Sequence, residues 1–172
     1  GKITNITGTQ LDKLINDGIK GVIFTGGGEP FLFTRLEDLV YHATERGADS
    51  VAYTNGNCIS ERRIKKLIEA QPLLVRVSLN CGTKSVYNQF HNPSDENGSF
   101  ERCLKTIEYL AQGSLANPKM SVGIGVVINK INQDKEVIFD MGEEFLNITI
   151  SGKCHTIAWP VVVESKDIFQ NF

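Results

Sequence analysis

The stretch from Gly21 to Phe33 reads GVIFTGGGEPFLF, and it decides the fold. The short apolar run from Val22 to Thr25 is typical of a buried strand, and it leads directly into three glycines, Glu29 and Pro30. Glycines let a ligand approach the backbone closely and reach its N–H groups. A carboxylate beside them suits a ligand with an ammonium or hydroxyl donor, and it does not suit a phosphate. The stretch therefore predicts a strand that ends at a binding loop.

Helical and strand patterns alternate on both sides of this stretch. We expect helices that begin at Thr9, at Thr34 (with Glu37 as its capping-box partner), at Ser60, at Ser99 and at Asn132. The last of these would bury Val137, Ile138, Met141 and Phe145. Further strands are expected over residues 51–54, 73–80, 122–128 and 156–163. Strands that alternate with helices predict βαβ units and a parallel sheet.

The two faces of the predicted strands differ, which distinguishes between the parallel α/β folds. In LLVRVSLN, Val75, Val77 and Leu79 share one face, while Arg76, Ser78 and Asn80 share the other. A doubly wound sheet needs two apolar faces, whereas a polar inner face fits a barrel with a ligand in its mouth. A full eight-unit barrel takes roughly 250 residues, and this chain holds about five to six units. We therefore predict an α/β fold, a partial (β/α)6-type TIM barrel with parallel strands.

The chain of 172 residues is expected to form one domain, 1–172, in which 146–172 supplies the last strand and a tail. Residues 146–155 fit the pattern poorly and are compatible with a hairpin or with an internal segment that is missing from the sequence. Composition is that of an ordinary globular protein, with 41% hydrophobic and 22% charged residues. A formal net charge of −2 predicts no nucleic-acid surface, and no apolar run is long enough for a membrane. The cysteines form no C-x-x-C pair, so we expect a cytoplasmic protein without a disulfide framework.

Polar or small residues follow each predicted strand at the point where it ends. Beside the glycine-rich stretch, these are Thr54-Asn55-Gly56, Ser78 and Asn80, and Asn129. In parallel α/β folds the ligand lies at the C-terminal ends of the strands. Each segment alone is more often a turn, and Ser78 and Asn80 could satisfy one another. Together they predict one site at one end of the sheet.

These motifs resemble those of the radical S-adenosylmethionine (radical SAM) superfamily. The matching segments are GGGEP after one strand, TNG after the next, then VRVSLN and GIGVVIN. SLNCGTKSVYNQFHNP also resembles the same region of members that modify peptides, sugars and other small molecules. The resemblance covers about residues 9–132.

The resemblance implies a set of positions that bind S-adenosyl-L-methionine (SAM). The glycine-rich segment would hold the amino group of the methionine part, which agrees with the ammonium partner that Glu29 suggests. The other segments would lie near the ribose, the carboxylate and the adenine. The implied positions are Gly26, Gly27, Gly28, Glu29, Pro30, Thr54, Asn55, Gly56, Ser78, Asn80, Val127 and Asn129.

The sequence departs from the family in one large respect. The family's C-x-x-x-C-x-x-C loop after the first strand binds a [4Fe-4S] cluster, and neither that loop nor that strand is present. We expect both to precede Gly1 in the native protein. Cys58 and Cys81 have the wrong spacing to replace them. Cys81 as a hydrogen-atom donor and His91 as a substrate contact stay open, whereas Cys103 is expected in the core.

Three functions fit the sequence. The first is a radical SAM enzyme core that cleaves SAM reductively to a 5′-deoxyadenosyl radical, which abstracts hydrogen from a substrate. The second is a cluster-free half-barrel that binds SAM or a nucleoside. The third is an unrelated barrel enzyme that uses Glu29 as an acid or base. The substrate is unknown, and the first function implies an external electron donor as a partner.

Overall fold

The computed structural model describes residues 7–127, 130–132, 137–140, 145–148 and 159–162. Its main sheet has the strand order β1-β2-β3-β4-β7, with β1 at Gly21–Phe24, β2 at Asp49–Thr54, β3 at Leu74–Ser78, β4 at Ser121–Val126 and β7 at Trp159–Val162. The pairs β1–β2, β2–β3 and β3–β4 are parallel. The predicted α/β architecture with parallel strands is thus confirmed as a partial TIM-barrel-type core.

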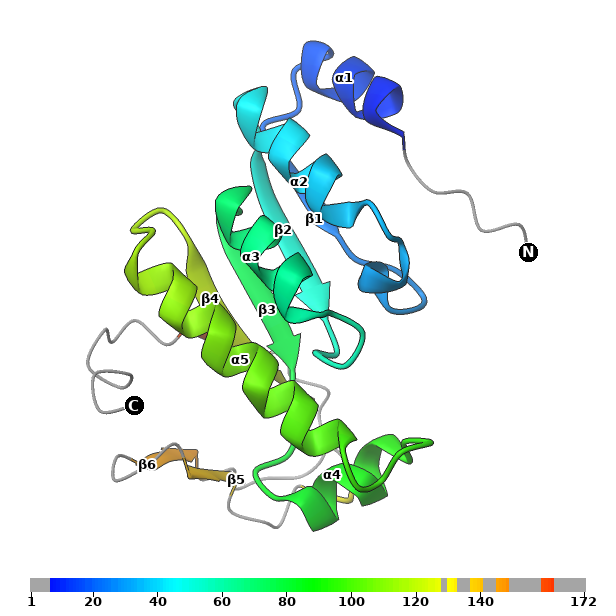
Figure 1. The fold of residues 1–172 in the computed structure, drawn as a ribbon, viewed down its shortest axis with the longest axis vertical. Coiled ribbons are helices and arrows are strands. Elements are labelled where there is room, and N and C mark those ends of the chain that lie inside the picture. Colours follow the sequence, from blue (N-terminus) through cyan, green and yellow to red (C-terminus); the bar gives the residue numbers. More distant parts are fainter. Residues whose placement is uncertain (1–6, 128–129, 133–136, 141–144, 149–158, 163–172) are drawn as a thin grey trace.

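The helices that connect the parallel strands lie on one face of the sheet (Figure 1). They are α2 at Leu36–Glu45, α3 at Glu61–Glu69 and α5 at Ser99–Leu115. The remaining helices lie at opposite ends of the strands, α1 (Gly8–Asn16) at the N-terminal end and α4 (Lys84–His91) at the C-terminal end. A doubly wound sheet would carry connecting helices on both faces. The one-sided arrangement therefore favours the barrel-type interpretation over the doubly wound one.

Alternating burial along the strands shows which side chains meet the helices. On β3, Val75 and Val77 are fully buried, and the intervening Arg76 and Ser78 are only partly buried. On β4, Val122, Ile124 and Val126 are buried in the same core. This confirms the predicted apolar face. The opposite face carries the polar residues and forms the inner side of the half-barrel.

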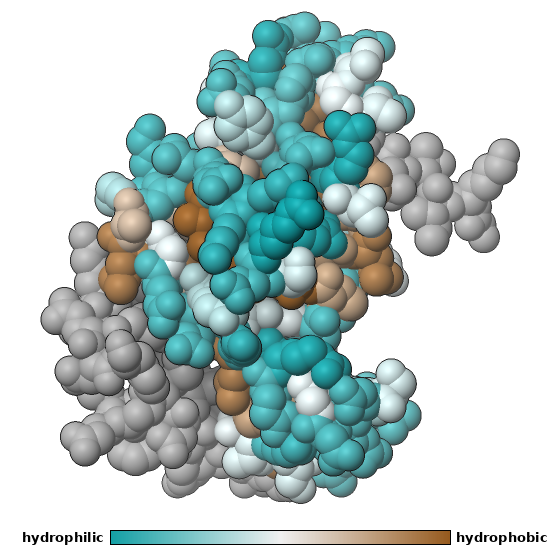
Figure 2. All heavy atoms as spheres, in the orientation of Figure 1, coloured by the Kyte–Doolittle hydropathy of each residue, from teal (hydrophilic) through white to brown (hydrophobic). Residues whose placement is uncertain are grey.

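The core fills the space between this apolar face and the three connecting helices. Leu39, Val40, Leu67 and Leu110 come from the helices and are all less than a tenth exposed. The outer surface of the helices is mostly hydrophilic, and hydrophobic residues show mainly in the seams between them (Figure 2). None of the helices in the described part of the chain is long and apolar enough to cross a membrane.

Two predicted helix starts differ from the structure. The first helix is capped by Thr7, which forms a capping box with Gln10, and not by Thr9. The predicted box of Thr34 and Glu37 is wrong, because α2 begins after Arg35 and has no side-chain cap. Glu37 instead points into the protein, where it pairs with Arg63. A tertiary ion pair thus replaced the local bond that the sequence pattern suggested.

The region after β4 differs most from the prediction. The helix expected from Asn132 is wrong, since Val137–Asp140 forms the strand β5, which pairs antiparallel with β6 at Phe145–Ile148. Three consecutive apolar residues with high strand propensity outweighed the helical spacing.

β7 then pairs antiparallel with β4 and is not the parallel strand expected there. A parallel return needs a crossover, usually a helix, and a hairpin takes its place here. The separate status of 146–172 stays a prediction.

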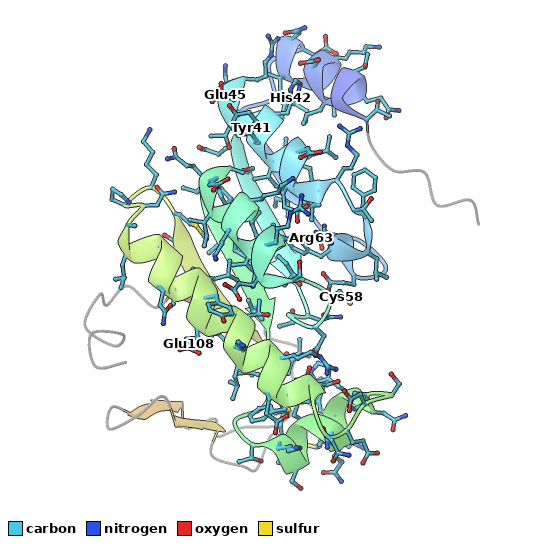
Figure 3. The ribbon with its side chains drawn as sticks, in the orientation of Figure 1. Tyr41, His42, Glu45, Cys58, Arg63 and Glu108 are labelled. Atoms are coloured by element: carbon cyan, nitrogen blue, oxygen red, sulfur yellow. The ribbon has the colours of Figure 1, made fainter. Side chains whose placement is uncertain are left out.

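Arg63 connects α2, α3 and the loop after β1 (Figure 3). Its guanidinium pairs with Glu37, which is only 4% exposed, and donates to the Phe31 carbonyl at 2.5 Å and the Phe33 carbonyl at 2.8 Å. It also lies over the Phe31 ring, 5.6 Å from its centroid. Phe31 belongs to the short helix η1 at Pro30–Leu32. One side chain therefore fixes the path of the chain directly after Glu29.

Replacement of Arg63 by Met is expected to lower the free energy of unfolding by about 3–5 kcal/mol, because the Glu37 carboxylate stays buried without its cation. Urea unfolding followed by circular dichroism measures this loss. The double variant Arg63→Met/Glu37→Leu should recover much of it, since no unpaired charge remains. A double variant as unstable as the single one would contradict this explanation.

Candidate functional site

A cavity of about 260 Å³ lies at the C-terminal ends of β1, β2 and β3. Its walls come from the glycine loop (residues 26–30), from the segment after β2 and from the inner face of the sheet. The lining residues are Thr25, Gly26, Gly28, Glu29, Pro30, Tyr53, Thr54, Asn55 and Ser78. This volume is near the lower end of small-molecule sites, about 300–1,000 Å³. The structure thus brings together residues that the sequence places at three separate strand ends.

The glycine loop is open on the side where side chains would stand. None of Gly26, Gly27 and Gly28 has a positive φ, so the backbone does not require glycine there. A Cβ added to Gly27 or Gly28 would meet no atom within 4 Å, and at Gly26 it would meet only the Gly28 nitrogen at 4.0 Å. Neither backbone strain nor packing explains the three glycines. Gly26 and Gly28 line the cavity and leave one of its walls as bare backbone, whereas Gly27 is not among the lining residues.

Glu29 joins the glycine loop to the segment after β2. Its Oε1 accepts hydrogen bonds from the Phe31 N–H at 3.0 Å and the Thr54 hydroxyl at 2.8 Å. Its Oε2 accepts one from the Asn55 N–H at 2.6 Å. A carboxylate has about four acceptor positions, so Oε2 can still accept one further donor. The charge of Glu29 is held in place by protein donors and remains available beside the cavity.

Thr54-Asn55-Gly56 has a partly structural role. Thr54 is buried, and its hydroxyl accepts a hydrogen bond from the Gly56 N–H at 3.0 Å while donating to Glu29. Gly56 has φ +75°, and an added Cβ would lie 3.1 Å from the Cys103 sulfur and 3.1 Å from a Val77 methyl. Gly56 is therefore required by the turn and by close packing. Only Thr54 and Asn55 of this segment reach the cavity.

Asn80 connects β3 to β4 and α4. It is only 5% exposed and has φ +63°. Its Oδ1 accepts a hydrogen bond from the Val127 N–H at 2.8 Å, so its Nδ2 faces His91 Nε2, 3.2 Å away. The side chain of Asn132 donates to the Asn80 carbonyl at 2.8 Å. Asn80 thus positions neighbouring elements, whereas Ser78 lines the cavity directly.

The other predicted positions lie around this core of the site. Val127 follows β4 and is partly buried. Asn129 lies outside the residues that the structure describes. The SAM-binding roles of the whole predicted set stay predictions, since no ligand is present to test them.

The histidine and cysteines near the site are mostly buried. Cys81 is 0% exposed, and Cys103 is 0% exposed in the core as predicted. Burial, followed by the nearby charge of Glu29, raises the pKa of the Cys103 thiol to about 12. Burial also lowers the pKa of His91, partly offset by the Leu79 carbonyl. Cys58 is exposed on the loop after β2 (Figure 3).

A [4Fe-4S] cluster does not fit the described residues. No three His, Cys, Asp or Glu side chains among them converge as a metal site. The cysteines among them, Cys58, Cys81 and Cys103, do not form a common set of ligands. Any cluster ligands would have to come from outside the described part of the chain.

Sequence reasoning missed several residues that shape the site. Tyr53 lies two residues before Asn55 and therefore faces the same side of β2, which period-two alternation could have shown. Arg63, which holds the loop after Glu29, lies on a helix and carries no sequence signal for that role. A second cavity of about 300 Å³ between α1 and α2 holds none of the predicted site residues. We therefore place the candidate site at the strand ends.

Comparison with known proteins gives a family match for most of the chain. Residues 8–141 match the family model described as the radical SAM superfamily. The match includes the glycine loop, the segments after β2 and β3, and β4. No curated protein matches the chain.

Replacement of Gly56 by Ala is expected to destabilise the protein by about 2–4 kcal/mol, because left-handed strain adds to overpacking against Cys103. Gly27→Ala is the matched control, since its Cβ would meet nothing within 4 Å and its φ is not positive. We expect that control to change the free energy of unfolding by less than about 0.5 kcal/mol. Equal effects of the two variants in chemical denaturation would refute the structural assignment of Gly56.

Stability should also depend on pH through His91. Because burial lowers its pKa below the ordinary value of 6.5, the unfolded chain takes up a proton that the folded protein resists. The contribution of neutral His91 to the free energy of unfolding is therefore complete above pH 6.5, and it is lost as the pH falls below that value. We expect wild type to lose more unfolding free energy than His91→Gln between about pH 7.5 and about pH 5. Parallel losses in the two proteins would show that His91 does not titrate in this way.

Proposed function

This chain belongs to the radical SAM superfamily, and we propose that it binds S-adenosylmethionine in the cavity at the strand ends. We further propose that it acts as the core of an enzyme that cleaves SAM reductively to a 5′-deoxyadenosyl radical, which abstracts hydrogen from a substrate. The observation that carries the SAM site is the Glu29 carboxylate, which keeps an acceptor position beside a wall of bare glycine backbone.

The cavity residues suit the amino-acid end of SAM. An ammonium group needs acceptors, and Glu29 supplies a charged one, while the carbonyls of the glycine loop can supply neutral ones. The hydroxyl of Ser78 and the amide of Asn55 can bond hydroxyl or carboxylate groups from the opposite wall. Glu29 is already held by Thr54, Phe31 and Asn55, so little reorganisation is needed when a cation arrives.

The radical step requires a group that residues 1–172 do not offer in recognisable form. In this family a bound [4Fe-4S] cluster supplies the electron that cleaves SAM. The sequence contains no C-x-x-x-C-x-x-C motif, and the described residues form no cluster site. We therefore assign this chain the binding and orientation of SAM, and we derive no step through the cluster from it.

Binding of SAM tests the proposed site. Glu29→Gln is expected to lower the affinity for SAM by about tenfold to a hundredfold, since a hydrogen bond to a charged group is worth about 1.5–3 kcal/mol. Methylthioadenosine lacks the amino-acid part, so its affinity should change little. Isothermal titration calorimetry measures both ligands, and Asp49→Asn at the exposed start of β2 is the control for loss of one carboxylate. Equal weakening of both ligands would argue against an ammonium contact at Glu29.

Anaerobic reconstitution tests the redox part separately. With iron and sulfide, followed by a strong reductant, a radical SAM enzyme should take up iron and release 5′-deoxyadenosine from SAM. A chain that binds SAM but takes up no iron would instead fit the cluster-free half-barrel. A chain that binds neither SAM nor methylthioadenosine would overturn the proposed site altogether.

A further inference from the structure

Arg76 is a partly buried cation on the inner face of the half-barrel. It lies in the middle of β3, between Val75 and Val77, which face the helices. Its Nε atom is buried and has no hydrogen-bond partner in the part of the chain that the structure describes. Among the described residues no carboxylate forms an ion pair with it. A buried N–H group without an acceptor is unfavourable, so this arrangement needs an explanation.

Other arginines of the described chain show how unusual this is. Arg35, Arg46, Arg63 and Arg102 each pair with an aspartate or glutamate. Arg62 lies on the exposed side of α3, where water can solvate it. Arg76 combines partial burial with the absence of any such partner, and it does so on the face where a ligand of a half-barrel would lie.

The neighbours of Arg76 hold its guanidinium near the cavity. The group lies over the ring of Tyr53, its register partner on β2, 5.1 Å from the ring centroid. On the other side, a Cβ added to Gly125 would lie only 2.5 Å from Nε, so the side chain rests against bare backbone of β4. Gly125 pairs with Ser78, which lines the cavity. The Arg76 side chain therefore extends toward the C-terminal end of β3, where the cavity lies.

We propose that Arg76 is the anchor for an anionic group, a carboxylate or phosphate, of a ligand that enters the half-barrel. The planar guanidinium offers several N–H donors in a fixed fork that matches an oxyanion. Tyr53 supports its face, and the missing side chain of Gly125 leaves room for its stem. The anion would bind the terminal nitrogens of the guanidinium and supply the negative charge that no described residue places beside it.

Two sources could supply this anion, and they share the same chemistry. One is the carboxylate of SAM itself, if the proposed function holds. The other is an acidic group on the substrate, which would then be a carboxylic acid or a phosphate ester. The second source does not require SAM to bind first, so the anion site can be tested alone.

Inorganic phosphate serves as the probe in the first experiment. Thermal unfolding of the full chain is followed as phosphate replaces chloride at constant ionic strength, and the stabilisation gives a dissociation constant. We expect Arg76→Gln to raise that constant at least about tenfold, as for hydrogen bonds to charged groups. Arg62→Gln removes the same charge from the outer surface and should leave the constant unchanged. Arg76→Lys keeps the charge but lacks the forked guanidinium. Its dissociation constant for phosphate should therefore lie between those of wild type and Arg76→Gln.

The same phosphate dependence in wild type, Arg76→Gln and Arg76→Lys would overturn the proposal. Phosphate also stabilises proteins generally by exclusion from their surface, and that part is common to all variants. If Arg76→Gln proves too unstable to measure, the comparison of Arg76→Lys with Arg62→Gln still decides the outcome.

A second experiment separates the two sources. SAM and decarboxylated SAM differ by the carboxylate, and calorimetry gives the ratio of their affinities. If Arg76→Gln removes the preference for SAM, Arg76 binds the carboxylate of SAM. If the preference is unchanged while phosphate binding is lost, the anion belongs to the substrate. If neither compound binds but Arg76-dependent phosphate binding persists, the proposed SAM site fails and the anion site remains.

Discussion

The carboxylate of Glu29 is the interaction on which the candidate site depends. It accepts hydrogen bonds from the backbone on its own loop and from Thr54 and Asn55 on the next strand end. Within the described part of the chain, no other side-chain hydrogen bond joins these two loops, so Glu29 fixes their relative position. Arg63 supports the same arrangement from the helix side, because it binds the carbonyls of the residues that follow Glu29. A negative and a positive side chain thus fix the glycine loop from both directions.

A division of labour follows among the polar residues at the strand ends. Gly56 and Asn80 adopt positive φ and bond or pack within the protein, so their main effect is on structure. Ser78, Asn55, Gly26 and Gly28 line the cavity and can meet a ligand. Position at a strand end is therefore a weaker indicator of ligand contact than position combined with the direction of the side chain.

The sequence predicted the first four strands and most of the residues around the cavity, because those depend on short-range patterns. Period-two alternation identified the apolar face of β3, and glycine and polar clusters identified the strand ends. Prediction failed where distant contacts decide. Glu37 has the spacing of a capping box but pairs with Arg63, and Val137–Asp140 forms a strand where helical spacing was read. The lack of an acidic partner for Arg76 among the described residues could not be predicted either, because it depends on which acids lie nearby in space.

The hydrogen bonds that build the cavity also say something about how it forms during folding. Glu29 meets its partners at sequence separations of 25 and 26 residues, and Arg63 meets the Phe31 carbonyl at a separation of 32. Contacts between residues so far apart in the sequence require the intervening chain to close into a loop, which costs conformational entropy. The GGGEP letters therefore specify no binding surface by themselves. The site requires β2 and α3 in place and is therefore a product of the whole parallel unit.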